Sequence, residues 1–333
     1  MAIINSYLNI RNSLRNITDI EFEEIIEQLA EEISKVNVEL TYTDDKLNED
    51  WAKLVKWKNK FDYINSTERI GMKLCEHFFP NFYDIENNQG ISYRSLWTKE
   101  NLVKILRWNR KSHSTPYLSE LKRGVYFCCG LTKNTMYRPQ MAKMACLTYK
   151  PEIVLDPCAG WGGRMLGVVS SGAKYIAFEP NTTTYNNIVK LAKFLNIENR
   201  VQLICDDARS MLKYNLPNVG MVLTSPPYFD LEVYTHEDTQ SITNTSTYEM
   251  WVEDFLNDIM NKSTSLLNSN GISCWNVGKV GKYNMNDDVL KFHIDNGFNK
   301  DKVLSVISSK RQTLQKPNSK KSSDDTVAFK RST

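Results

Sequence analysis

The sequence predicts a doubly wound, Rossmann-like α/β domain over residues 134–333, preceded by a mostly helical, basic region over residues 1–133. From residue 151 onwards, short apolar runs alternate with segments of helical periodicity, which is typical of a parallel sheet covered by helices on both faces. In the first 60 residues, apolar side chains recur at helical spacing. The composition, 41% hydrophobic and 24% charged over 333 residues, is that of an ordinary globular chain.

The elements follow in order along the chain. A helix is expected from Ile20 to Ile33 with Asp19 as its cap, and residues 61–135 then alternate aromatic and basic side chains without a clean period. Seven strands are expected at 153–155, 175–178, 201–204, 220–223, 271–277, 303–308 and 326–330. Helices are expected at 164–171, 185–195, 251–267 and 289–296. Because the last two strands follow one another directly, we expect a reversed hairpin at the edge of the sheet.

Cysteine, histidine and hydropathy patterns exclude several classes of protein. The seven cysteines are odd in number and lack CxxC pairs, and the four histidines have no metal-ligand spacing. We therefore expect free thiols and no bound metal. No stretch approaches the roughly 18 apolar residues of a membrane span, and the first residues lack the apolar core of a signal peptide. These features predict a cytoplasmic protein without a membrane partner. They do not indicate whether the protein is a monomer or an oligomer.

Charge is segregated along the chain. Residues 51–150 carry 18 basic and 7 acidic side chains, a net charge of +11, whereas residues 1–50 carry 4 and 12, a net charge of −8. A basic stretch interleaved with aromatic residues suits contacts to the phosphates and bases of nucleic acid. Chance clustering on a solvated surface gives the same pattern, so composition alone leaves both interpretations open.

A glycine-rich turn, Asp156-Pro-Cys-Ala-Gly-Trp-Gly-Gly-Arg164, follows the first predicted strand. Its glycines allow a tight turn and close approach of a ligand, and the start of the next helix offers free N–H groups. The spacing G-x-G-G differs from the dinucleotide fingerprint G-x-G-x-x-G. A leading carboxylate suits an ammonium group better than a pyrophosphate, which indicates the methionine moiety of S-adenosylmethionine. We expect this cofactor to contact Asp156, Ala159, Gly160 and Gly162.

Acids also end the next two predicted strands. Glu179 ends the second strand, where a carboxylate can accept hydrogen bonds from both ribose hydroxyls of a nucleotide. Asp206 and Asp207 follow the third strand, where an acid could bind the adenine amino group. Acids at three successive strand ends, on the edge of the sheet where ligands bind, predict one cofactor site.

The fourth predicted strand ends in Thr224-Ser225-Pro226-Pro227-Tyr228. Two prolines cannot continue a central strand, so the chain leaves the sheet in a stiff turn. An exocyclic amino group is a poor nucleophile because its lone pair is delocalised into the ring. Ser225 and the Pro226 carbonyl can grip its hydrogens, and Tyr228 can hold the base by stacking. We expect Ser225, Pro226, Pro227 and Tyr228 to form the catalytic turn.

These motifs resemble those of the S-adenosylmethionine-dependent DNA amino-methyltransferases, whose hallmark is a (D/N/S)PPY tetrapeptide after a glycine-rich cofactor motif. The similarity covers about residues 134–333, and the motif order is γ-like. Tyr137-Arg138-Pro139 resembles the additional cofactor segment of that family, which implies that Arg138 contacts the cofactor. Residues after 229 barely complete the sheet, so the resemblance assigns target recognition to residues 1–133.

The resemblance implies direct methyl transfer to an exocyclic amine of a base flipped out of double-stranded DNA. Serine at the head of the tetrapeptide favours cytosine N4, and adenine N6 is the alternative. RNA and protein-glutamine amino-methyltransferases use a similar turn, and a non-catalytic regulatory subunit could retain it. Asp230, Glu232 and Gln240 are expected to close over the base. Attack on a ring carbon would require a thiolate on the loop that instead carries Ser-Pro-Pro-Tyr.

Overall fold

The computed structural model describes residues 7, 10–59, 61–131, 134–229, 233–234, 241–242, 245, 247–280, 282–307 and 322–332. The chain forms two compact units. Unit 1 comprises residues 1–40, 80–135 and 232–234, and unit 2 comprises residues 41–79, 136–231 and 235–333.

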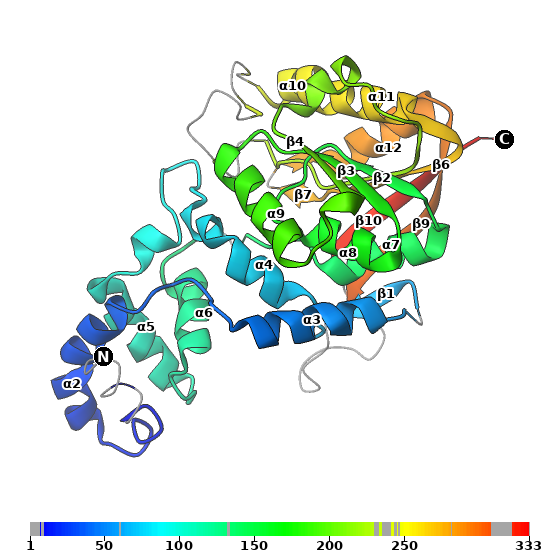
Figure 1. Cartoon of the computed structure of the whole chain (residues 1–333). Coiled ribbons are helices and arrows are strands. Elements are labelled where there is room, and N and C mark those ends of the chain that lie inside the picture. Colours follow the sequence, from blue (N-terminus) through cyan, green and yellow to red (C-terminus); the bar gives the residue numbers. More distant parts are fainter. Residues whose placement is uncertain are drawn as a thin grey trace. The chain divides into compact units, whose positions relative to one another are not determined.

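An eight-stranded sheet forms the centre of unit 2, with the strand order β1-β9-β10-β6-β5-β2-β3-β4 (Figure 1). The strands are β1 (Tyr63–Asn65), β2 (Ile153–Asp156), β3 (Lys174–Phe178), β4 (Val201–Ile204), β5 (Val219–Thr224), β6 (Leu267–Asn276), β9 (Phe298–Ile307) and β10 (Ser322–Arg331). A separate two-stranded ribbon pairs β7 (Lys279–Val280) with β8 (Tyr283–Asn284). Among the described strands of the large sheet, only β10 runs antiparallel to its neighbours. The predicted doubly wound Rossmann-like fold is confirmed.

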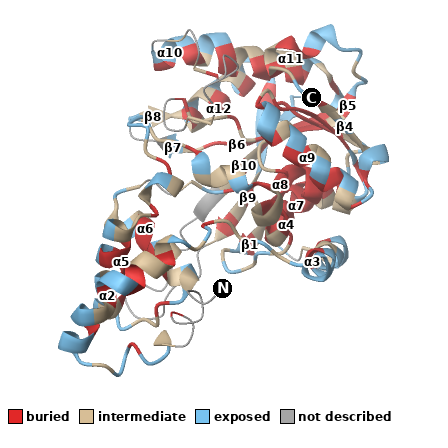
Figure 2. Cartoon of the chain, turned by 60° about the vertical axis from the view of Figure 1, so that its left-hand side comes forward, coloured by how far each residue is buried: buried red, intermediate tan, exposed pale blue. Residues whose placement is uncertain are grey.

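Helices cover both faces of this sheet. Figure 1 shows α7, α8 and α9 on one face and α11 and α12 on the other. The helices of unit 2 are α3 (Asp44–Lys56), α4 (Met72–Phe78), α7 (Pro139–Tyr149), α8 (Gly163–Ser171), α9 (Thr182–Phe194), α10 (Tyr248–Trp251), α11 (Asp258–Ser265) and α12 (Met285–Asp295). Because both faces are covered, the central strands are apolar throughout rather than alternating. Buried residues accordingly gather in the strands and in α7 and α8 (Figure 2).

The sheet differs from the prediction at one edge. The large sheet has eight strands instead of seven in the described part of the chain, because β1 pairs in parallel with β9 and sets Tyr63 opposite Ser305. Three residues are too few to show a strand period, so the sequence pattern gave no signal for β1. The predicted terminal hairpin forms between β9 and β10, but β10 is inserted between β6 and β9, and β1 occupies the outer edge.

Residues 41–79 belong to unit 2, although they lie in the region predicted as N-terminal. The Nζ atom of Lys143 on α7 donates hydrogen bonds to the carbonyl oxygens of Leu54 and Val55, each at 2.7 Å, at the end of α3. The Asp50 carboxylate accepts a hydrogen bond from the Lys73 backbone N–H, which links α3 to α4. Tertiary contacts of this kind do not alter the local periodicity of the sequence. The boundary predicted at residue 134 therefore did not take them into account.

Unit 1 is helical and has its own core. Its helices are α2 (Asp19–Ser34), α5 (Lys99–Lys111) and α6 (Leu118–Cys128), with short 3-10 turns at Pro80–Asp84 and Arg94–Leu96. Thr18, not Asp19, caps α2, and it forms a capping box with Glu21. Residues such as Phe22, Leu102 and Leu121 are buried between the helices.

The charge segregation seen along the sequence is largely cancelled in unit 1. Acidic side chains of α2 pair with basic side chains of α5: Glu23 with Arg107, Asp19 with Arg110, and Glu27 with Lys99. Unit 1 as a whole holds 12 Lys and Arg against 13 Asp and Glu, a net charge of −1. The net charge of +11 counted over residues 51–150 is therefore not a property of this unit, because part of that stretch belongs to unit 2.

Candidate active site

The motif residues lie where the parallel strands of unit 2 end. The glycine-rich turn follows β2, Glu179 follows β3, Asp206 follows β4, and Ser225 follows β5. Parallel pairing of β4, β3, β2 and β5 places all four strand ends on one edge of the sheet. The strand topology therefore places these motifs on one edge of the sheet, as the sequence predicted.

Two glycines of the turn are required by packing. Gly162 caps α8 with φ of 71°, and a Cβ atom there would lie 2.9 Å from Leu191 Cδ2 and from Phe79 Cε2. A Cβ atom on Gly163 would overlap the Tyr137 carbonyl oxygen. At Gly160, with φ of 59°, the nearest atom to a Cβ would be Arg164 Nη2 at 3.6 Å. A Cβ atom would thus make only ordinary contacts at Gly160, whereas residues 162 and 163 are closed by neighbouring groups.

Asp156 organises this loop from a fully buried position. Its carboxylate accepts hydrogen bonds from Arg164 Nε at 2.6 Å, Tyr175 Oη at 2.6 Å, Thr224 Oγ1 at 2.7 Å and the Cys158 N–H at 3.1 Å. The side chain thus connects β2, β3, β5 and α8. These four donors assign Asp156 a role in holding the loop, and its contact with a cofactor stays a prediction.

The partners of Asp156 were not predicted from the sequence. Arg164 forms a salt bridge with Asp156 while only 4% of its side chain is exposed, and its guanidinium also donates to the Cys158 carbonyl. Tyr175 is buried on β3. An Asp and an Arg flanking a glycine-rich turn could have suggested the ion pair, but no sequence signal singles out Tyr175 or Thr224.

Glu179 is fixed at the end of β3. Its carboxylate accepts hydrogen bonds from the Gly160 N–H at 2.9 Å and the Asn181 N–H at 3.1 Å. Burial raises the pKa of Glu179 to about 7, and the two backbone donors partly oppose that shift. The carboxylate is therefore held next to the open part of the glycine-rich turn, in the position expected of a group that binds ribose hydroxyls.

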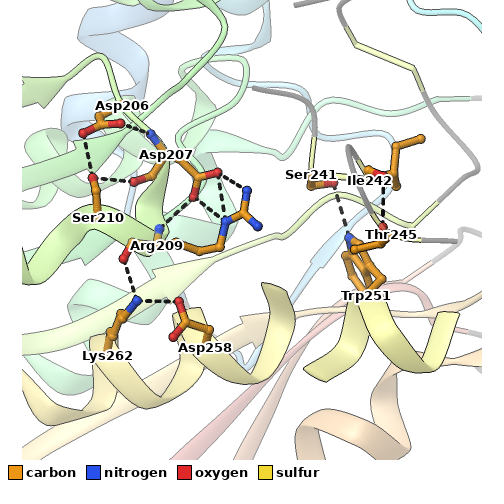
Figure 3. A network of polar contacts seen from close by, with 10 residues as sticks. All are labelled: Asp206, Asp207, Arg209, Ser210, Ser241, Ile242, Thr245, Trp251, Asp258 and Lys262. Carbon is orange, nitrogen blue, oxygen red and sulfur yellow. Dashed lines mark hydrogen bonds and ion pairs between the residues drawn. The ribbon is translucent and has the colours of Figure 1, made fainter. Parts of the chain in front are cut away.

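The acids after β4 are engaged in a polar network (Figure 3). Asp206 accepts hydrogen bonds from Ser210 Oγ and Tyr214 Oη, each at 2.7 Å, and the Ser210 contact is the main reason that its pKa is lowered. Asp207 pairs with Arg209 at 2.6 Å and caps the 3-10 helix Ala208–Lys213. Lys262 extends the network from α11 by donating to the Arg209 carbonyl. Binding of adenine by either acid stays a prediction.

Two further predicted cofactor residues are tied to other parts of unit 2. The Ala159 N–H donates to the Phe178 carbonyl at 2.9 Å, which attaches the turn to β3. The Arg138 guanidinium donates to the carbonyl oxygens of Ser66, at 2.9 Å, and Glu68. Arg138 thereby holds the loop after β1 against the start of α7, and its predicted cofactor contact is untested.

The Ser-Pro-Pro-Tyr turn leaves the sheet directly after β5, as predicted. Ser225 Oγ donates a hydrogen bond to Asn276 Oδ1 at the end of β6, with 3.2 Å between the two oxygens. The Tyr228 hydroxyl lies over Gly278, where a Cβ atom would be 3.5 Å away. Phe229 then turns the chain with φ of 41°. Asp230, Glu232 and Gln240, expected to close over a base, lie outside the described residues.

An aromatic cavity lies next to this turn. Its volume is about 410 Å³, and its lining consists of Phe229, Ile242, Thr245, Thr247, Tyr248, Glu249, Lys282 and Tyr283. The Tyr248 and Tyr283 rings stack with centroids 4.3 Å apart, and Phe229 meets Tyr283 edge-on at 5.5 Å. Near Ile242 in the sequence, Trp251 Nε1 donates to Ser241 Oγ at 3.4 Å (Figure 3). No sequence pattern predicted this cavity.

Comparison with known proteins adds one decisive match. A family model for RNA cap guanine-N2 methyltransferases matches residues 151–267, the segment that carries both the glycine-rich turn and the Ser-Pro-Pro-Tyr turn. The chain is an S-adenosylmethionine-dependent methyltransferase. The open Gly160 position beside the fixed Glu179 carboxylate fits that cofactor. A comparison with curated proteins finds no match.

Solved structures resemble this methyltransferase at low identity. An rRNA methylase from Streptococcus thermophilus is 15% identical, with 60% of this chain and 100% of that chain covered and a TM-score of 0.39. TrmN from Thermus thermophilus is 15% identical, with 58% and 48% covered and a TM-score of 0.41. A SAM-dependent O-methyltransferase from Thermotoga maritima is 10% identical, with 66% and 73% covered and a TM-score of 0.40. At this level the similarities say nothing about the substrate.

The predicted membership in the DNA amino-methyltransferases is wrong, and so is double-stranded DNA as the partner. The matching family model describes enzymes that act on an RNA guanine. The physical reason is that a Ser-Pro-Pro-Tyr turn suits an exocyclic amine, and cytosine, adenine and guanine all carry one. The tetrapeptide therefore does not specify the polymer.

Two features bear on other predicted partners. Within the described part of the chain, no helix is both long enough and apolar enough to cross a membrane. Among those same residues, His, Cys, Asp and Glu side chains form no group of three that could hold a metal ion. The cytoplasmic location stays a prediction.

Proposed function

We propose that this methyltransferase modifies an exocyclic amino group of a base in RNA, with guanine N2 as the acceptor. The observation that carries the proposal is the match of residues 151–267 to the RNA cap guanine-N2 family model. That segment contains Asp156, Glu179 and the whole Ser-Pro-Pro-Tyr turn, so the match covers the residues that would perform the chemistry.

The turn supplies what an exocyclic amine requires. Ser225 Oγ and the Pro226 carbonyl can accept the two amine hydrogens, which localises the nitrogen lone pair. Tyr228 can stack on the base, a contact worth about 1 to 3 kcal/mol in nucleic-acid complexes. When bound, S-adenosylmethionine supplies an electrophilic methyl group on a sulfonium. The protein residues then act mainly by orienting the acceptor nitrogen.

A covalent thiol mechanism has no support at this site. Cys158 is the cysteine of the glycine-rich turn, and burial raises the pKa of its thiol well above the usual range, with the nearby Asp156 charge adding to the shift. A protonated thiol is a poor nucleophile. We therefore assign catalysis to the Ser-Pro-Pro-Tyr turn, and we expect Cys158→Ser to retain methyl transfer.

The cofactor assignment follows from the strand ends. We propose that Glu179 binds the ribose hydroxyls and that the Gly160 backbone lies against the methionine moiety. Asp207 would exchange part of its contact with Arg209 for the adenine amino group. Asp156 and Arg164 would hold the loop from behind, because their charges are already paired with each other.

We further propose that unit 1 contributes to target selection. An exposed cluster on α5 and α6 supports this: the Trp108 and Phe127 rings stack with centroids 5.5 Å apart, and the Arg123 guanidinium lies 5.8 Å from each centroid. Phe127 is 66% exposed. Aromatic rings beside an arginine can stack on unpaired bases. Trp108→Ala should weaken RNA binding, whereas Ile20→Ala, which removes an exposed apolar side chain of α2, should not.

The proposal is tested by methyl transfer from isotopically labelled S-adenosylmethionine to total RNA and to DNA in parallel. We expect label in RNA that disappears after ribonuclease treatment. Tyr228→Ala should abolish most of the label while S-adenosylhomocysteine still binds with nearly unchanged affinity. Label found in DNA and absent from RNA would contradict the proposed substrate.

A further inference from the structure

We propose that Asn276 is a positioning residue that makes Ser225 a hydrogen-bond acceptor toward the amine being methylated. The inference rests on the proposed function, because it concerns the same amino-transfer reaction. Its basis is the contact between Ser225 Oγ and Asn276 Oδ1 at 3.2 Å, which joins the end of β5 to the end of β6.

The orientation of the Asn276 amide follows from its second partner. Asn276 Nδ2 lies 2.8 Å from the Asp325 carbonyl oxygen. A carbonyl oxygen can only accept, so the amide must present its NH₂ group to Asp325 and its oxygen to Ser225. The amide oxygen in turn can only accept, which leaves Ser225 as the donor. The direction of both hydrogen bonds is thus fixed by chemistry and not by the choice between two amide rotamers.

This direction determines what Ser225 offers to a substrate. A serine hydroxyl has one proton and two lone pairs. With the proton engaged by Asn276, the oxygen can interact with a further group only as an acceptor. An exocyclic amine presents hydrogens and is matched by this arrangement. A ring nitrogen or a carbonyl oxygen presents a lone pair and is disfavoured, so Asn276 would also contribute to selection of the acceptor atom.

Asn276 is itself held rigidly. It is 5% exposed and pairs in register with Thr326 of β10. Thr326 is fully buried, and its Oγ1 atom lies 3.4 Å from Asn276 Nδ2 and 3.0 Å from the Tyr137 hydroxyl. The residue before Ser225 is fixed separately, through the Thr224 hydrogen bond to Asp156. The orientation of Ser225 is therefore set by groups that do not need to move during the reaction.

A double-mutant cycle tests whether Asn276 acts through Ser225. We expect Asn276→Ala to lower kcat about tenfold, the order expected for one lost hydrogen bond, with the affinity for S-adenosylhomocysteine unchanged. In a Ser225→Ala background, Asn276→Ala should cause little further loss, because no hydroxyl remains to be oriented. An equal loss in both backgrounds would overturn the inference.

Ser273→Ala is the matched control for this cycle. Ser273 is a fully buried polar residue on the same strand, and its hydroxyl contacts Trp275 Nε1 and His293 Nε2, each at 2.8 Å. Its effect on kcat, whatever its size, should be the same with Ser or Ala at position 225. Coupling of Ser273 to position 225 as strong as that of Asn276 would show a general effect of strand β6 and would overturn the assignment.

Neutron diffraction of the deuterated wild-type protein separates this inference from the choice of substrate. We expect the Ser225 hydroxyl deuteron on the line to Asn276 Oδ1 and the Asn276 ND₂ group facing the Asp325 carbonyl. A deuteron pointing elsewhere, or a reversed amide, would overturn the inference even if RNA is methylated. Failure to label any RNA would overturn the proposed function alone. The predicted direction of the Ser225–Asn276 hydrogen bond would then still be decided by the neutron density map.

Discussion

Glu179, for which we propose contacts to the ribose hydroxyls of the cofactor, has a pKa close to neutral pH. Burial raises its pKa to about 7 from an ordinary value of 4.5, and the nearby Asp156 charge adds to the shift while Arg164 opposes it. Two ribose hydroxyls are donors, so they bind the ionised carboxylate better than the protonated acid. Cofactor affinity should therefore depend on pH near neutrality.

We predict that the affinity for S-adenosylhomocysteine falls as pH drops below about 7, as measured by titration calorimetry. Glu179→Gln should bind more weakly and show no such dependence. Stability of the free protein should change in the opposite sense. Because the folded state binds the proton more tightly than the unfolded state, stability falls as pH rises between about 4.5 and 7. Parallel binding profiles for the wild type and Glu179→Gln would contradict the assignment.

Asp156 and Arg164 form a buried ion pair, which is costly to break from one side. We predict that Asp156→Asn lowers the free energy of unfolding by about 3 to 5 kcal/mol, because the Arg164 charge is left buried without its counter-ion. Urea unfolding measures this change. Glu49→Gln, which breaks the exposed Glu49–Lys53 pair on α3, is the control and should leave the stability unchanged. A loss no larger than that of the control would show that Asp156 is not essential to the loop.

At this scale the sequence identified the positions of the motif residues but not their partners. Asp156, Glu179, Asp207 and Ser225 were expected at strand ends, because short apolar runs marked where each strand stopped. Asn276 was missed, because the Ser225 contact depends on the pairing of β5 with β6, which are separated by more than 40 residues. Local sequence patterns do not reveal contacts between residues that lie so far apart in the chain.

At the scale of elements, α3 depends on a buried lysine from α7. Lys143 donates hydrogen bonds to the carbonyl oxygens of Leu54 and Val55 in the last turn of the helix, where the Leu54 carbonyl also accepts from the Trp57 N–H. We predict that Lys143→Met destabilises the protein by about 1 to 3 kcal/mol, since an apolar side chain removes both hydrogen bonds of the lysine. Lys53→Met, on the exposed side of α3, is the matched control in the same urea titration. Equal stability of the two variants would refute the prediction.

Seven of the eight strands of the large sheet could be predicted because each contains a short apolar run. β1 and the placement of α3 and α4 could not, since their contacts with β9 and α7 join residues far apart in the chain. The glycines illustrate the same limit. A G-x-G-G spacing indicates a ligand loop, but only the structure shows that Gly162 and Gly163 are closed by Leu191, Phe79 and Tyr137.

At the scale of the whole molecule, charge counted along the chain was misleading. The acidic start of the sequence folds against the basic stretch, so that unit 1 is close to neutral. Arg107 and Arg110 are engaged with Glu23 and Asp19, and Arg110 also donates to the Leu14 and Ile17 carbonyls. These side chains are engaged within unit 1, so their substitution would not report on nucleic-acid contacts alone.

The division into units predicts that residues 134–333 do not fold alone. A chain truncated at 134 loses β1, α3 and α4, and with them Leu54 and Phe79, which are both fully buried. We expect it to lack a cooperative thermal transition, as followed by circular dichroism, whereas the full chain unfolds cooperatively. Cooperative unfolding of the truncated chain with normal S-adenosylhomocysteine binding would show that residues 41–79 are dispensable.

The central claim is that this methyltransferase acts on an exocyclic amine of an RNA base. Mass spectrometry of nucleosides tests it most directly, after reaction of RNA and DNA with S-adenosylmethionine that carries a deuterated methyl group. The account predicts mass-labelled N2-methylguanosine from RNA, present with the wild type and lost with Tyr228→Ala. A label on a ring carbon, or a label found only in deoxynucleosides, would contradict it.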